Sequence, residues 1–146
     1  MAGKFKLQSV LRYREILEDQ ARQRLTESLA RERALQAEIA LCKEQLEPLW
    51  QEFESKRRVG ISVQDLILYE GHIRGREKEL KELNAKLVSL EEEVAAHRRD
   101  LCQAGQDRML LEKLKEKKES EEKEEVQRQD RAILDEISLQ FRKEDL

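Results

Sequence analysis

Few residues in this sequence have the types and spacing that chemistry requires. The two cysteines, Cys42 and Cys102, form no Cys-x-x-Cys pair and have no histidine nearby, which argues against a zinc site or a disulfide framework. His97 stands alone, without a nucleophile or an orienting carboxylate, and is therefore a poor general base. No glycine-rich phosphate loop or cluster of metal ligands occurs. We expect a protein that is not an enzyme, with no cofactor, no metal and no catalytic residue.

The composition points to long helices. The chain has 146 residues, of which 42% are charged and 4% aromatic, with one proline. This profile is typical of a coiled coil and unlike that of a compact globule. The formal net charge is −3 with both signs interleaved, so no nucleic-acid partner is indicated. No apolar stretch resembles a signal peptide or a membrane span, and we expect a cytoplasmic protein with reduced thiols.

The first helix carries a heptad seam, a row of apolar residues spaced alternately by four and three positions. Its regular part consists of Leu35, Ile39, Cys42, Leu46, Leu49 and Phe53, and it is preceded by a less regular part that consists of Leu7, Val10, Leu17, Ala21 and Leu25. Because Ser28 and Glu32 fall on the projected seam, we predict that the register slips near them. Pro48 removes one helical hydrogen bond and predicts a bend without a break.

A second, more regular seam follows a turn. It consists of Leu66, Tyr69, Ile73, Leu80, Leu83, Leu87, Leu90, Val94, Leu101, Ala104 and Leu111, with Arg76, His97 and Arg108 in its gaps. Gly60 suits the end of the first helix and Ser62 the cap of the next. The prediction is all-α: a single domain, 1–146, forming a long antiparallel two-helix coiled-coil hairpin. Helix 1 covers about 4–57, the turn 58–61, and the longer helix 2 about 63–141.

The end of helix 2 has no partner within the chain. If the chain folds back near residue 60, position i faces about 119 − i, and helix 2 overhangs over 115–146. Opposite charges four residues apart, such as Lys115 and Glu119, support an isolated helix by roughly 0.2–0.5 kcal/mol each. An apolar strip returns at Ile133, Leu134, Ile137 and Phe141. An uncovered strip of this kind predicts a partner.

Three stretches resemble FliJ, a coiled-coil family of the flagellar type III export apparatus. They are FKLQSVLRYREILEDQARQRL (5–25), GISVQDLILYE (60–70) and DRMLLEKLKEKKESEEKEEVQRQDRAILDEISLQF (107–141). The resemblance implies a stalk that enters the hexameric export ATPase FliI and promotes its assembly and activity. It further implies contacts with the export gate protein FlhA and with export chaperones, and attachment to the inner membrane only through these partners.

The resemblance also implies which residues bind. Those expected to face the ATPase are Phe5, Leu7, Val10, Leu11, Leu114, Leu134, Asp135, Glu136 and Phe141. Tyr69 and Ile73 are expected to face the gate, although His72 and Arg76 interrupt that surface. Two alternatives remain open at this point: a self-associating structural coiled-coil scaffold, and a stalk counterpart from a virulence type III secretion system.

Overall fold

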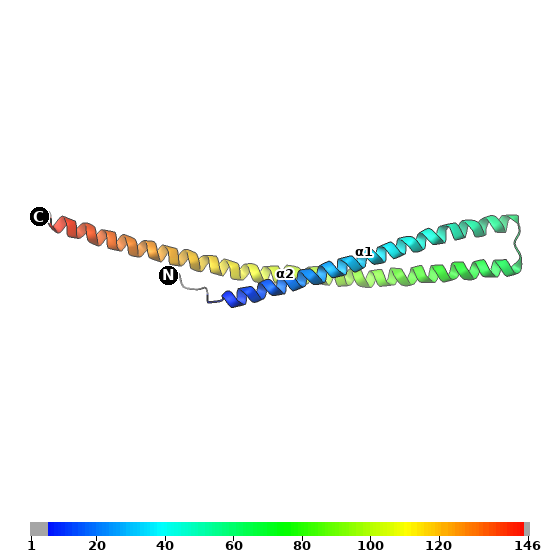
Figure 1. The fold of residues 1–146 in the computed structure, drawn as a ribbon, viewed down its shortest axis with the longest axis horizontal. Helices are drawn as coiled ribbons and strands as arrows, with labels where there is room; N and C mark the ends of the chain where they lie inside the picture. The colour runs from blue at the N-terminus through cyan, green and yellow to red at the C-terminus, as the bar shows by residue number, and fades with distance from the viewer. Residues whose placement is uncertain (1–5, 145–146) are drawn as a thin grey trace. The chain divides into compact units, whose positions relative to one another are not determined.

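The computed structural model describes residues 6–144, which form two helices joined by a short turn (Figure 1). Helix α1 spans Gln8–Val59 and helix α2 spans Val63–Glu144. The described residues contain no strand, and the longer α2 packs against α1 as a hairpin. This confirms the predicted fold class, and α1 continues through Pro48 without a break. Both helices end slightly later than the sequence predicted.

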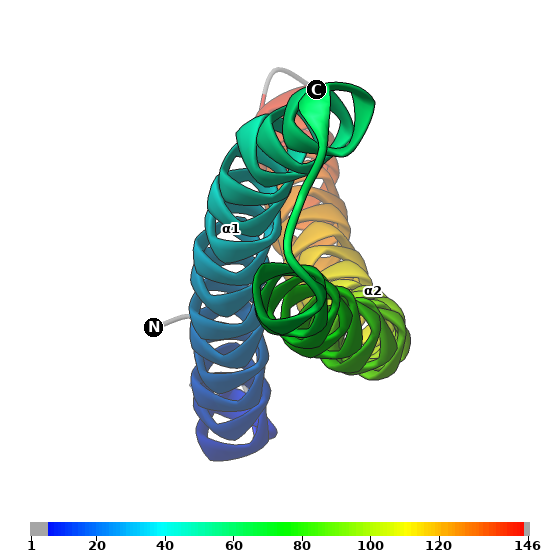
Figure 2. The same ribbon diagram turned by 90° about the vertical axis from the view of Figure 1, so that its right-hand side faces the viewer.

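The turn has the features that the sequence predicted. Gly60 has a φ of +114°, in the left-handed region where a residue without a β-carbon is favoured. Its N–H donates to the carbonyl oxygen of Lys56 over 3.0 Å. At the start of α2 the N–H of Asp65 donates to Oγ of Ser62 over 3.1 Å, which confirms Ser62 as the N-cap. Figure 2 faces this turn.

The chain forms two compact units. One, here called the turn unit, consists of residues 20–101 and contains the end of α1, the turn and the start of α2. The other, the terminal unit, contains the described residues 6–19 and 102–144. The expectation of a single domain stays a prediction.

The core of the turn unit lies along the predicted seams. Its buried apolar side chains are Ala21, Ile39, Cys42, Phe53, Ile73 and Val94. Near the turn, the ring of Phe53 lies 6.1 Å from that of Trp50 and 5.7 Å from that of Tyr69, between centroids. The hydroxyl of Tyr69 donates to Oε1 of Glu52 over 2.9 Å. Contacts between α1 and the first part of α2 thus close the turn unit beside the turn.

The register slip predicted near Ser28 and Glu32 is wrong. The buried positions of α1 are 11, 18, 21, 28, 39, 42 and 53. All of them fall on a single series of seam positions that are spaced alternately by three and four residues, without interruption. Ser28 is 0% exposed, yet its hydroxyl donates to the carbonyl oxygen of Leu25 over 2.9 Å. A serine can occupy a seam in this way because its own helix satisfies its hydroxyl.

The terminal unit has a polar seam. Leu11 is buried, but the next buried residue is Glu18, whose carboxylate pairs with the guanidinium of Arg108. Arg108 also bonds to Glu112 over 2.7 Å. The pKa of Arg108 is raised, first by its hydrogen bond to Glu112 and then by that to Glu18. Ion pairs therefore join α1 to α2 in the terminal unit beside the single buried apolar side chain of its described residues, Leu11, whereas the turn unit buries several.

Candidate partner-binding site

The last part of α2 is a helix with no second helix beside it in the terminal unit (Figure 1, orange to red). Every residue from 123 to 144 is exposed. Charged side chains dominate its first half, and Arg128 pairs with Glu125 over 3.2 Å. Such exposed pairs each contribute little, but no proline or glycine follows Gly105 to interrupt the helix. Within the described residues the helix therefore continues through 123–144 with all of its side chains exposed, and the predicted bounds of the overhang, 115–146, stay a prediction.

The apolar strip of this overhang lies open to solvent. Ile133, Leu134, Ile137 and Phe141 are 55%, 62%, 43% and 65% exposed. Their spacing of three and four residues places them on one face of the helix. A contiguous apolar face on an otherwise charged helix is typical of a surface that an amphipathic helix lays into a partner. The strip is therefore the strongest candidate binding surface of the terminal unit.

The residues expected to face the ATPase separate into two groups. Leu7, Val10 and Leu114 are exposed on the paired part of the terminal unit. Leu134, Asp135, Glu136 and Phe141 are exposed on the overhang. With a rise of about 1.5 Å per residue, Leu134 lies about 30 Å along α2 from Leu114. A partner that meets both groups must therefore contact a long stretch of α2.

Of the two remaining residues of that expected set, one is buried and the other is not described by the structure. Leu11 is 3% exposed and thus belongs to the seam, so any effect of changing it on binding would pass through the pairing of α1 with α2. Phe5 lies outside the residues that the structure describes.

The two residues expected to face the gate differ in their accessibility. Tyr69 is half-buried, but it lines a surface pocket together with Lys56, Asp65, Leu68 and His72. Nζ of Lys56 lies 5.0 Å from the centre of its ring. Ile73, in contrast, is 4% exposed, so a partner could reach it only if the helices separated. The gate contact stays a prediction, and of the two residues Tyr69 offers the accessible surface.

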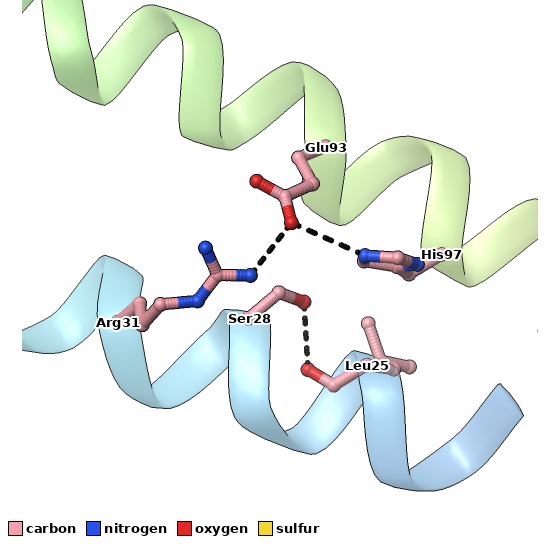
Figure 3. A network of polar contacts seen from close by, with 5 residues as sticks. All are labelled: Leu25, Ser28, Arg31, Glu93 and His97. Carbon is pink, nitrogen blue, oxygen red and sulfur yellow. Dashed lines mark hydrogen bonds and ion pairs between the residues drawn. The ribbon is translucent and has the colours of Figure 1, made fainter. Parts of the chain in front are cut away.

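A polar cluster in the turn unit contains the histidine that the sequence singled out (Figure 3). Glu93 accepts a hydrogen bond from Arg31 over 2.6 Å and lies 3.4 Å from Nε2 of His97. The pKa of Glu93 is lowered, first by Arg31 and then by His97. His97 therefore has the neighbouring carboxylate that sequence reasoning denied it, placed one helical turn earlier on α2. The spacing of four residues was the signal that could have revealed it.

This cluster links α1 to α2 within the turn unit through the pair of Arg31 and Glu93. The hydroxyl of Ser28 is buried and donates its hydrogen bond to the carbonyl oxygen of Leu25. Nδ1 of His97 is buried without a hydrogen-bond partner. Within residues 6–144, no group of three or more His, Cys, Asp or Glu side chains is placed to hold a metal ion. In the same part of the chain no helix is long and apolar enough to span a bilayer.

Comparison with known families gives one finding that covers nearly the whole chain. The family model described as "Flagellar FliJ protein" matches residues 3–144. It favours a flagellar protein over the virulence counterpart that the sequence left open. Searches of curated proteins and of solved structures give no match.

Proposed function

The chain belongs to the FliJ family of flagellar proteins and is a component of flagellar protein export, and we propose that it works as a non-enzymatic stalk. In this proposal the end of the hairpin that holds the chain termini enters the hexameric export ATPase FliI. There it promotes assembly and activity of the ring. The observation that carries the proposal is the exposed apolar strip of the overhang.

The strip supports the proposal because it is an exposed apolar face on a helix that is already formed. The overhang already adopts its helical conformation through α2, so little conformational entropy is lost when it binds. Burying Leu134 and Phe141 in a pore would remove about half or more of each side chain from water, and such burial is the main source of affinity. The flanking carboxylates of Asp135 and Glu136 would orient the helix toward basic groups of the ring.

The remaining contacts of the proposal rest on the family resemblance. Tyr69, at the surface of the turn unit, would contact the gate protein FlhA, and empty export chaperones would bind elsewhere along the hairpin. The protein would then be cytoplasmic and associate with the inner membrane at the export apparatus. The hairpin would act as one domain, 1–146, between ATPase and gate.

The test measures ATP hydrolysis by purified FliI with and without the full chain. Ile137→Ser combined with Phe141→Ser should abolish stimulation, since it removes the centre and end of the strip. Leu41→Ser combined with Val88→Ser is the matched control, because both residues are exposed apolar side chains of the turn unit. Circular dichroism should show an unchanged helix content in both variants. If the strip variant stimulates FliI as well as the control does, the stalk proposal fails.

Self-association through the same strip is the second candidate function, favoured by the same exposure of apolar side chains. Light scattering of the full chain distinguishes the two. A stable dimer that the paired substitutions Ile137→Ser and Phe141→Ser convert to a monomer would support a scaffold. A monomer at all concentrations would support the stalk.

A further inference from the structure

The turn carries a second exposed apolar surface, which the proposed function does not use. Val59 and Val63 flank the turn and are 89% and 71% exposed, and Ile67, one helical turn after Val63, is 63% exposed. We call these three residues the turn patch. None of them lies on a seam, since the buried positions nearest the turn are Phe53 on α1 and Ile73 on α2. Packing between α1 and α2 therefore does not explain them.

Basic residues stand directly beside the turn patch. The last turn of α1 contains Lys56, Arg57 and Arg58, and residues 55–64 include no acidic residue. Lys56 pairs with Glu52 over 3.5 Å and Arg57 with Glu54 over 3.7 Å, but all four side chains are more than half exposed and the pairs are weak. Cations at the end of a helix also stabilise its dipole. That role accounts for the charges and leaves the exposed valines unexplained.

We propose that the turn patch binds an anionic lipid surface. Val59 and Val63 enter the boundary between headgroups and acyl chains, and the three basic side chains contact lipid phosphates. The formal net charge of the chain is −3, so attraction to an anionic surface must come from this local cluster. The contact goes beyond the proposed function, in which partners alone bring the protein to the membrane.

Two observations favour lipid over a second copy of the chain. A second copy would bring an identical group of positive charges against the first, and juxtaposed like charges oppose association. In addition, several backbone donors of the turn are already bonded: the N–H of Gly60 to Lys56, that of Asp65 to Ser62, and that of Leu66 to the Ser62 carbonyl oxygen over 2.9 Å. Satisfied backbone groups lower the cost of entering a medium that offers no hydrogen bonds.

The first test is co-sedimentation of the full chain with two kinds of vesicle, phosphatidylcholine alone and phosphatidylcholine mixed with phosphatidylglycerol. We expect binding to the mixed vesicles only, weakening as salt shortens the screening length. Replacing Lys56, Arg57 and Arg58 by Gln should lower the affinity about a hundredfold, at about fivefold per basic residue. Val59→Ser with Val63→Ser should lower it at least about tenfold. Leu41→Ser with Val88→Ser is again the matched control and should bind normally.

The second test asks which part of the chain enters the lipid. Trp50 is the single tryptophan, and it lies about 14 Å from Val59 along α1. In a Trp50→Phe background, Val59→Trp should be quenched strongly by brominated phosphatidylglycerol, whereas Val88→Trp should not. Trp50 of the unmodified chain should be quenched weakly.

Four results would overturn the proposal. The first is no binding to the mixed vesicles at low salt, and the second is an equal loss of vesicle affinity in the control and the turn variants. The third is equal quenching at Val59→Trp and Val88→Trp. The fourth is that the turn variants still bind vesicles but no longer bind a purified export protein. The last result would assign the turn patch to a protein partner. Since no ATPase is present in these assays, their outcome is independent of whether the terminal strip binds FliI.

Discussion

Phe53 is the side chain whose loss should weaken the turn unit most. It is 4% exposed and its ring contacts those of Trp50 and Tyr69. Replacing a buried Phe by Ala costs about 3–5 kcal/mol, and aromatic pairs account for about 0.5–1.5 kcal/mol each. A two-helix layer can close partly over the cavity, so we expect Phe53→Ala to lower the free energy of unfolding by about 3 kcal/mol. Phe53→Leu, which keeps most of the volume, should cost about 1 kcal/mol.

Urea denaturation measures this effect, with helix content followed by circular dichroism and the aromatic cluster by Trp50 fluorescence. Tyr13→Ala is the control, because Tyr13 is an exposed aromatic residue of the terminal unit, and it should change the unfolding free energy by less than about 0.5 kcal/mol. If Phe53→Ala proves no more destabilising than Tyr13→Ala, the aromatic cluster does not hold the two helices together beside the turn.

Three further predictions concern the backbone, the ion pairs and the seam. Gly60→Ala should destabilise the hairpin by about 1–2 kcal/mol in urea denaturation, because its φ of +114° strains any other residue. Gly71→Ala, at a helical position with nothing within 4 Å of the added carbon, should instead stabilise by up to about 1 kcal/mol. Glu93 has a lowered pKa, so its contribution is present above the ordinary carboxyl value and lost as pH falls through the lowered one. Acid titration of helix content should therefore show a smaller loss in Glu93→Gln than in the unmodified chain. Ser28→Leu should overpack the seam at a cost of about 1–3 kcal/mol, while Ser28→Ala should be nearly neutral in thermal melts.

The features that local sequence determines were predicted from the sequence. The 3–4 spacing of apolar residues identified both helices, and Gly60 and Ser62 located the turn between them, because capping and left-handed backbone depend on a few adjacent residues. The prediction of a register slip near Ser28 was wrong because it assumed that only apolar residues can occupy the seam. The hydroxyl of Ser28 is bonded within its own helix, to the carbonyl oxygen of Leu25, so this polar side chain can be buried on the seam.

The contacts between the helices could not be predicted residue by residue. The rule that position i faces about 119 − i pairs Arg31 with Val88, whereas Arg31 bonds to Glu93. An error of five positions matters little for locating an overhang of some thirty residues, but it changes every ion pair. For the candidate site, the apolar pattern was sufficient to predict an exposed strip. A specific partner for the strip is suggested by the family resemblance alone, because the residues themselves indicate only an apolar surface.

The chemistry of the seam differs between the two units in a way that bears on stability. In the turn unit the helices bury apolar side chains such as Ile39 and Val94. In the described part of the terminal unit, Leu11 is the one buried apolar side chain, beside the pair of Glu18 and Arg108. The attraction within a buried ion pair is largely offset by the cost of removing both charges from water. We therefore expect the helix pairing of the terminal unit to contribute less to the free energy of unfolding than that of the turn unit.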